Sequence, residues 1–236
     1  MKIGITERGD AALDTRWIEW VDDGKPAILI TKAPSKLFKV LLDEFETFPD
    51  GIIVHCTITG MGKTRVEPGV KHWEEELEAY CALREYVNPD YHRSGIVLRI
   101  DPIIPTDPTW TWLQPFFKAA QACSPARVRI SFMDGYPHVR KRGLKLRWEG
   151  MHAPLELRQE RLAQLRDMFI GAIEVCGEPG LPCTGCVSAK DLKILGVSNQ
   201  GSGGYQRDTC ACLANKVELL KRRGQCAHQC QYCYWR

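Results

Sequence analysis

The sequence has no apolar run of the length needed to cross a bilayer, and we expect no secretory leader at its start. Its formal net charge of +3 is small, so a nucleic-acid partner is permitted without being required. The glycine-rich stretch at 201–204 lacks the strand-turn-helix setting of a dinucleotide site, and no Walker-type phosphate loop is present. We therefore expect a cytoplasmic protein that has no membrane partner.

Short apolar runs alternate with amphipathic stretches along most of the chain. Strands are expected at residues 2–6, 26–31, 51–59, 95–101, 127–132 and 172–176, and helices at 12–21, 35–45, 70–86, 110–122 and 155–169. This alternation favours a parallel sheet with crossover helices, and continuous Val, Ile and Leu runs are typical of strands buried on both faces. We predict an α/β core at 1–176 and a cysteine-rich segment at 177–236 packed on the same domain. The pattern leaves open whether the sheet is flat or curled into a partial barrel.

Polar side chains follow the apolar part of several predicted strands. Because the carboxyl ends of parallel strands share one edge of a sheet, these residues are candidates for a common ligand site. The alternative is that they are polar only because loops meet water. The candidates for binding a cofactor or substrate are Lys32, Thr57, Thr59, Arg99, Asp101 and Ser131, together with Tyr232 near the end of the chain.

The end of the chain carries three thiols spaced C-x3-C-x2-C, namely Cys226, Cys230 and Cys233, with Tyr232 directly before the last. Three thiolates on one tight loop can hold a [4Fe–4S] cluster and leave the fourth iron open for another ligand. The alternative is a structural zinc that takes His228 as its fourth ligand. The compact triplet favours the iron–sulfur cluster, since zinc sites usually draw on two separated pairs.

The other eight cysteines fall into two groups. Two close pairs, Cys183 with Cys186 and Cys210 with Cys212, predict a four-thiolate site for an auxiliary [4Fe–4S] cluster or for zinc, in which Cys176 could replace one member. The isolated cysteines among apolar residues are expected to be buried inert thiols. These are Cys56, Cys81 and Cys123. No disulfide framework is expected, because eleven cysteines is an odd number and the chain is not a small secreted scaffold.

The C-x3-C-x2-C spacing with an aromatic before the last cysteine resembles the signature of radical S-adenosylmethionine enzymes. The resemblance implies that the open iron binds the amino and carboxylate groups of S-adenosylmethionine, and that reductive cleavage yields a 5′-deoxyadenosyl radical. It also implies an electron donor of flavodoxin or ferredoxin type and a partial (βα)6 TIM-like barrel. The motif normally lies near the N-terminus, so this chain would carry a permuted core with the cluster loop at its C-terminus.

Further motifs extend the resemblance. The stretches at 30–34, 57–62, 99–103, 130–134 and 206–212 are similar to those of an uncharacterised bacterial and phage family with a C-terminal cysteine cluster. The Cys233-Tyr234 pair and the Asp-Pro-Ile-Ile element are also distantly similar to spore photoproduct lyase. One departure is Thr6-Glu7-Arg8-Gly9-Asp10, where that family tends to have Ser-Arg-Arg-Thr-Asp. A role of the missing arginine is therefore not carried over.

Basic residues stand at 138–147 and at 221–223, and Trp148, Tyr234 and Trp235 could stack on bases, which suits a phosphate-bearing polymer. The alternative is a solvated loop and a cationic helix end. The resemblance implies a thymine-type base in DNA, hypermodified in phage genomes, that an isomerase or lyase would rearrange or cleave after extruding it from the duplex. A small molecule or peptide substrate stays open, as does a non-catalytic, zinc-stapled nucleic-acid-binding protein.

Overall fold

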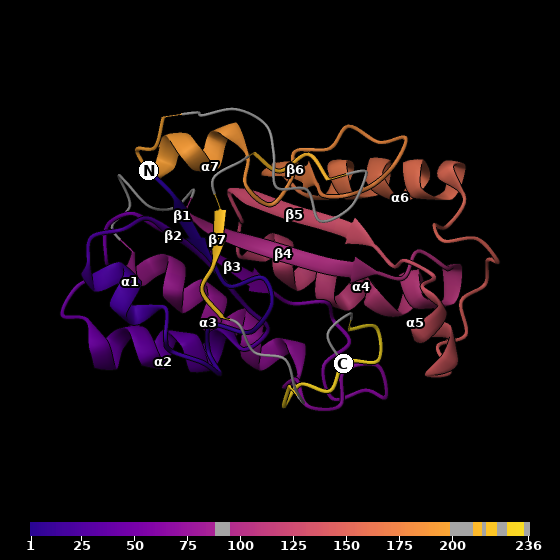
Figure 1. Ribbon diagram of the computed structural model, residues 1–236. Helices are drawn as coiled ribbons and strands as arrows, with labels where there is room; N and C mark the ends of the chain where they lie inside the picture. Colours follow the sequence, from indigo (N-terminus) through magenta and orange to yellow (C-terminus); the bar gives the residue numbers. More distant parts are fainter. Residues whose placement is uncertain (88–94, 199–209, 214–215, 221–225, 234–236) are drawn as a thin grey trace.

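The computed structural model describes residues 1–87, 95–198, 210–213, 216–220 and 226–233. They form an α/β protein around a seven-stranded parallel sheet with the order β6-β5-β4-β3-β2-β1-β7 (Figure 1). The strands are β1 (Ile3–Ile5), β2 (Ala27–Thr31), β3 (Ile52–Thr57), β4 (Ile96–Ile103), β5 (Arg127–Phe132), β6 (Ala172–Val175) and β7 (Lys216–Glu218). The six predicted strands and their parallel pairing are confirmed, whereas the short β7 was not predicted.

The strand order follows the order along the chain from β1 to β6. Each new strand is therefore added to the same edge of the sheet, without the reversal that marks a doubly wound fold. β7 joins the opposite edge, where Ile3 of β1 is in register with Lys216. The cysteine-rich segment thus contributes a strand to the sheet formed by the preceding core.

The helices are α1 (Ile18–Asp22), α2 (Pro34–Glu44), α3 (Trp73–Tyr86), α4 (Asp107–Ala122), α5 (Pro137–Lys141), α6 (Leu155–Met168) and α7 (Ala189–Ile194). In the part of the chain that the structure describes, none of them is long and apolar enough to span a membrane. The short α5 and α7 were not predicted, because five or six residues do not display a helical period.

The first helix is shorter than predicted. It was expected over residues 12–21, but α1 starts only at Ile18. The preceding residues turn around Asp10, whose backbone carbonyl accepts from the amides of Leu13 and Asp14, and whose side chain accepts from the amide of Ala12. An aspartate that bonds to nearby backbone amides competes with helix formation, which explains the later start.

The two faces of the sheet are covered differently. One face packs against α2, α3, α4 and α6 and forms the larger apolar core, with residues such as Leu29, Val54 and Leu98. On the other face, strand residues such as Ile5 and Ile53 contact a small cluster around α7 that includes Leu192. Figure 1 shows α2 and α3 on one side of the sheet and α7 on the other. The alternation of side chains along each strand produces this division.

Toward β5 and β6, the face under α7 carries buried charges instead of apolar side chains. Arg127 lies 2.7 Å from Glu174 and 2.6 Å from Asp191, and Arg129 lies 3.0 Å from Asp191. Burial alone would raise the pKa of the Asp191 carboxyl, but Arg129 and Arg127 hold it below its usual value. Asp191 also caps α7 through Ser188. The ion pairs therefore fix α7 on the sheet.

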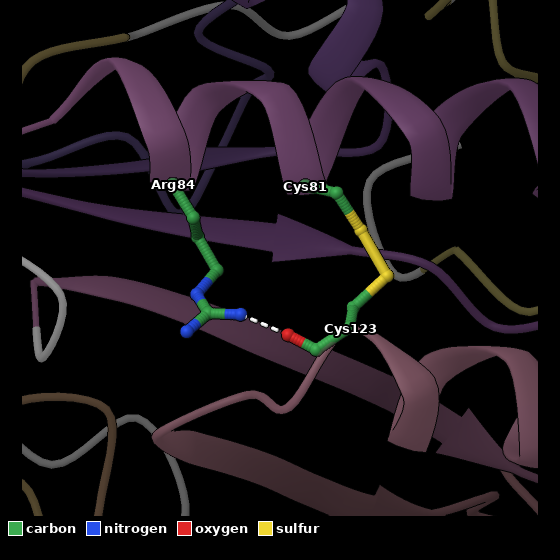
Figure 2. Close-up of a disulfide and its surroundings, with 3 residues drawn as sticks. All are labelled: Cys81, Arg84 and Cys123. Atoms are coloured by element: carbon green, nitrogen blue, oxygen red, sulfur yellow. Dashed lines mark hydrogen bonds between the residues drawn. A yellow bond between two sulfur atoms is a disulfide. The ribbon is translucent and has the colours of Figure 1, made fainter.

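One prediction about the isolated cysteines is wrong. Cys81 of α3 and Cys123, which follows α4, form a disulfide, while Arg84 donates a hydrogen bond to the Cys123 carbonyl oxygen (Figure 2). The two cysteines are 42 residues apart, so only the packing of α3 beside α4 brings them together. Cys56 is a fully buried thiol, as predicted.

Candidate functional site

The three C-terminal thiols lie on a loop at residues 226–233, here called the C-terminal loop, that docks on the segment after β3. The amide of Gln231 donates to the carbonyl of Val66 at 2.9 Å, and the amide of Gly69 donates to the carbonyl of His228 at 3.1 Å. A Cβ atom at Gly69 would lie 2.0 Å from the carbonyl oxygen of Ala227. Only glycine permits this approach, so the docking is built into the backbone.

Asp10 ties the C-terminal loop to the ends of β1 and β2. One carboxylate oxygen lies 2.7 Å from Nε2 of His228 and accepts the amide of Lys32 at 2.7 Å, and the other accepts the hydroxyl of Thr31 at 2.7 Å. Burial alone would raise the pKa of Asp10, but the bond to His228 and the other donors lower it overall. Asp10 follows the first predicted strand, but its position in the sequence did not predict a role in the site.

Glu67 connects residues from three parts of the site through its carboxylate, and this role was not predicted. Its carboxylate is 1% exposed, lies 2.9 Å from Nζ of Lys32, and accepts the hydroxyl of Thr59 at 2.6 Å. The hydroxyl of Tyr232, from the C-terminal loop, also donates to it. The predicted residues Lys32, Thr59 and Tyr232 therefore do come together, through a carboxylate that no sequence pattern indicated.

Lys32 lies at the centre of this network. Its ammonium group also donates to the carbonyl of Asp101 at 3.3 Å and lies 5.1 Å from the centre of the Tyr232 ring. Burial alone would lower the pKa of Lys32, but the negative charge of Glu67 and its hydrogen bond to the ammonium group raise it overall. Burial raises the pKa of the Cys230 thiol itself to about 12. A metal bound there would have to displace this proton.

The remaining strand-end residues form a second group beside Lys32. The guanidinium of Arg99 and the hydroxyl of Ser131 both donate to the carboxylate of Asp101. The hydroxyl of Thr57 is buried and has no hydrogen-bond partner among the described residues, and the same is true of Nε of Arg99. Two of the predicted residues thus keep polar atoms that a ligand could engage.

The other thiols meet on the α7 side of the sheet. Sγ of Cys176, just after β6, lies 3.1 Å from Sγ of Cys186, and the amide of Cys186 donates to Sγ of Cys212 at 3.1 Å. Hydrogen bonds from Cys176 and then Cys212 hold the pKa of the Cys186 thiol well below its usual value. Cys183, predicted as a ligand, instead accepts the amide of Glu178 and donates to its carbonyl. Within the described ranges, no three His, Cys, Asp or Glu side chains are already arranged around a metal position.

The predicted basic stretch is partly structural. Arg142, after α5, donates to the carbonyl of Cys233 at 2.6 Å and so supports the C-terminal loop. Lys141, Lys145 and Arg147 are exposed near it. The prediction that Trp148 stacks on bases is wrong, because its ring is 8% exposed within the apolar core. The expected contributions of residues 221–223, Tyr234 and Trp235 lie outside the described residues.

These features define a class: an α/β protein with a sequentially wound parallel sheet and a thiol-bearing C-terminal loop docked on polar strand-end residues. The family described as a domain of unknown function (DUF1848) matches residues 20–235, and the chain belongs to that family. Comparison with curated proteins and with solved structures finds no match.

Proposed function

We propose that this protein is a radical S-adenosylmethionine enzyme whose catalytic [4Fe–4S] cluster is held by Cys226, Cys230 and Cys233. The observation that carries the proposal is the docking of the C-terminal loop against the strand-end network of Glu67 and Lys32. A site of this class needs its thiol loop beside the carboxyl ends of parallel strands, where barrel enzymes bind their ligands.

The fold that we propose for this function is a partial (βα)6 barrel formed by β1 to β6. Its support is the sequential strand order, since barrel strands neighbour one another in chain order while doubly wound sheets reverse. Helices α2, α3, α4 and α6 cover one face, as the outer ring of a barrel would. The permuted position of the thiol loop is compatible with this arrangement, because a chain end can reach the strand ends as a loop can.

The donor set fits the proposed cofactors. Three thiols on one short loop match the ligand requirement of a cluster with one open iron. When bound, the reduced cluster with S-adenosylmethionine supplies a 5′-deoxyadenosyl radical that abstracts a hydrogen atom from the substrate. The buried and unpartnered hydroxyl of Thr57 offers a polar contact for a ligand at the same edge.

The residues of the chain divide into positioning and binding roles. Lys32, Thr59 and Tyr232 are engaged with Glu67, so in our proposal they hold the C-terminal loop against the sheet. Thr57 and Arg99 keep free polar atoms and would contact S-adenosylmethionine or the substrate. Asp101 orients Arg99 and Ser131 beside them.

The test is formation of 5′-deoxyadenosine by protein reconstituted anaerobically with iron and sulfide, with dithionite in place of a flavodoxin or ferredoxin. We expect a brown protein that cleaves S-adenosylmethionine, and a Cys230→Ala variant that does not. Cys183→Ala is the matched control and is expected to stay active, because its thiol faces Glu178. A colourless zinc protein that forms no 5′-deoxyadenosine would contradict the proposal. It would favour a non-catalytic nucleic-acid-binding protein that zinc stabilises.

For the substrate we propose a modified thymine-type base in DNA. The support is the exposed basic group of Lys141, Lys145 and Arg147, next to Arg142, which binds the C-terminal loop. Cationic side chains beside the site would contact backbone phosphates. We expect DNA to stimulate 5′-deoxyadenosine formation, and the stimulation to disappear in a Lys141→Glu/Lys145→Glu/Arg147→Glu variant. Stimulation that survives these charge reversals, or is absent from the start, would direct the search to small molecules or peptides.

A further inference from the structure

Thiols from three separate segments of the chain converge beneath the start of α7. Cys176 follows β6, Cys186 precedes α7, and Cys210 and Cys212 stand on the segment before β7. Sγ of Cys176 lies 3.1 Å from Sγ of Cys186, the amide of Cys186 donates to Sγ of Cys212 at 3.1 Å, and Cys210 stands two residues before Cys212. We call these four residues the second thiol group. Cys186 and Cys212 are almost fully buried.

The backbone around the second thiol group is shaped for this convergence. Gly185 has a φ of +75°, and a Cβ atom there would lie 2.6 Å from the amide nitrogen of Cys212. The amide of Leu213 also donates to the carbonyl of Val187 at 2.9 Å, which holds the two segments side by side. The amide of Cys186 donates to Sγ of Cys212, a type of bond that stabilises a thiolate ligand.

Positive charges surround the second thiol group. Arg129 donates to the carbonyl of Cys186 at 2.9 Å, and its positive charge acts on the Cys186 thiol. Arg99 acts on the thiols of Cys176 and Cys186, and Lys216 acts on that of Cys212. Four thiolates around a zinc ion or a [4Fe–4S]²⁺ cluster leave about two negative charges, which a buried site must compensate. These three cations offset part of that charge, since each is also paired with a carboxylate, Arg129 with Asp191, Arg99 with Asp101 and Lys216 with Glu7.

We propose that Cys176, Cys186, Cys210 and Cys212 bind a second, thiophilic metal centre, and that Cys183 is not one of its ligands. The sulfur atoms of Cys176 and Cys186 stand at 3.1 Å, as hydrogen-bonded thiols do. Around a tetrahedral zinc with bonds of about 2.3 Å the separation is about 3.8 Å. Zinc binding therefore requires these two sulfurs to lose their protons and move apart by under an ångström, whereas a [4Fe–4S] cluster requires a larger separation. Among the described side chains, no metal position is already formed.

The centre goes beyond the proposed function and does not depend on it. The test uses the full chain with Cys226, Cys230 and Cys233 all replaced by Ala, so that metal on the C-terminal loop does not contribute. After reconstitution with iron and sulfide, or purification with zinc, we expect this variant to retain either about four iron atoms with sulfide or one zinc ion per chain. The two results identify which metal occupies the same four thiolates.

Further replacements in that background define the ligands. Adding Cys176→Ala or Cys212→Ala should remove most of the remaining metal, while adding Cys183→Ala should leave it unchanged. Metal loss with Cys183→Ala but not with Cys176→Ala would overturn the ligand set. A triple variant that holds no metal although it unfolds cooperatively would overturn the centre itself.

A measurement on the unaltered protein covers the case in which these variants do not fold. Alkylation followed by mass spectrometry should show Cys176, Cys186, Cys210 and Cys212 protected together, and modified together once a strong chelator has removed the metal. A disulfide between Cys176 and Cys186 in metal-free protein as isolated would contradict the proposal. Modification of the four cysteines at the same rate with and without chelator would contradict it as well.

Discussion

The two cysteine-rich regions of this protein are built in opposite ways. The thiols of the C-terminal loop all come from residues 226–233, and side chains of the sheet edge, led by Glu67 and Asp10, hold the loop in place. The second thiol group comes from three separate segments, in which Sγ of Cys176 contacts Sγ of Cys186 and the amide of Cys186 donates to Sγ of Cys212. The C-terminal loop is one continuous segment that other residues hold in place. The second thiol group exists only because the fold brings its three segments together.

This difference determines whether the spacing of cysteines in the sequence can identify the metal ligands. A triplet within one loop has its geometry limited by the short chain between its members, so the sequence alone identifies the candidate ligands. For the second group, the C-x2-C pattern of Cys183 and Cys186 suggested a pair, but the fold turns Cys183 to Glu178 and places Cys176 beside Cys186. The predictions below separate the two regions by disturbing one at a time.

The largest effect is expected from Asp191→Ala, which acts on the second region. Asp191 pairs with Arg127 and Arg129, and Arg129 in turn holds the carbonyl of Cys186. Removing one partner of a buried ion pair costs about 3–5 kcal/mol. Urea unfolding should show a loss of this size and cysteine alkylation should rise in the second thiol group.

The neighbouring Lys190→Ala is the control for that change. Lys190 is exposed on the same helix, so its loss should alter the free energy of unfolding by less than about 0.5 kcal/mol. If both variants lose similar stability, the ion pairs do not fix α7 on the sheet.

A smaller effect, confined to the C-terminal loop, is expected from Gly69→Ala. The added Cβ would meet the carbonyl oxygen of Ala227 at 2.0 Å, so the loop must move away at a cost of about 1–3 kcal/mol. Alkylation of Cys230, which is 5% exposed, should accelerate, and 5′-deoxyadenosine formation should fall at least tenfold. Metal bound by the second thiol group should be unchanged.

Gly150→Ala is the control for Gly69→Ala. A Cβ atom at Gly150 has only an ordinary contact, at 3.7 Å, with the carbonyl oxygen of His152. Equal loss of activity in both variants would mean that the close approach at Gly69 does not position the loop.

The reciprocal change is Gly185→Ala, compared with Gly196→Ala. Both glycines have positive φ, +75° and +65°, so both variants pay a backbone cost of about 1–2 kcal/mol. Only at Gly185 would the Cβ also meet the backbone of Cys212 and Ala211, whereas nothing lies within 4 Å at Gly196. Gly185→Ala alone should therefore lose metal from the second thiol group while the C-terminal loop keeps its thiols protected. If Gly185→Ala kept its metal, the close approach at Gly185 would not be needed to position the second thiol group.

Much of the fold follows from the sequence because it rests on long apolar runs. The six predicted strands are present, and the bounds of α2, α3, α4 and α6 differ by a few residues from the prediction. The short α7 and β7 were missed because they are stabilised by tertiary partners, α7 by the ion pairs of Asp191 and β7 by pairing with β1. Their own sequences carry too few residues for a periodic pattern.

The candidate site was predictable where residues stand at strand ends or in a known spacing, as with Lys32, Arg99 and Tyr232. Glu67 was not, since a carboxylate in a loop gives no signal of burial until the partners that neutralise it are known. The Cys81–Cys123 disulfide and the burial of Trp148 were missed for the same reason. Both depend on which segments pack together.

The smallest effect concerns pH and Glu218 in β7, the strand that connects the two regions along the chain. Its carboxylate accepts the amides of Arg8 and Leu220, at 2.9 Å and 3.1 Å, but burial outweighs these bonds and raises its pKa from 4.5 to about 7. The folded protein therefore keeps this proton to a higher pH than the unfolded chain does. This group's contribution to stability must then fall as pH rises from about 4.5 to about 7. Because the side chain is partly exposed, we expect less than about 1 kcal/mol.

Glu218→Gln removes the titrating group, so urea unfolding of both proteins at pH 5 and pH 7.5 isolates its contribution. The excess stability of the variant over the original protein should be small at pH 5, just above the unfolded-state pKa of 4.5, and larger at pH 7.5. A difference that stays constant across this range would show that the Glu218 carboxyl titrates alike in the folded and unfolded chains. Since a neutral side chain keeps the same hydrogen-bond acceptor, alkylation of Cys186 and of Cys230 should be unchanged. A change at either thiol would show that β7 couples the two regions.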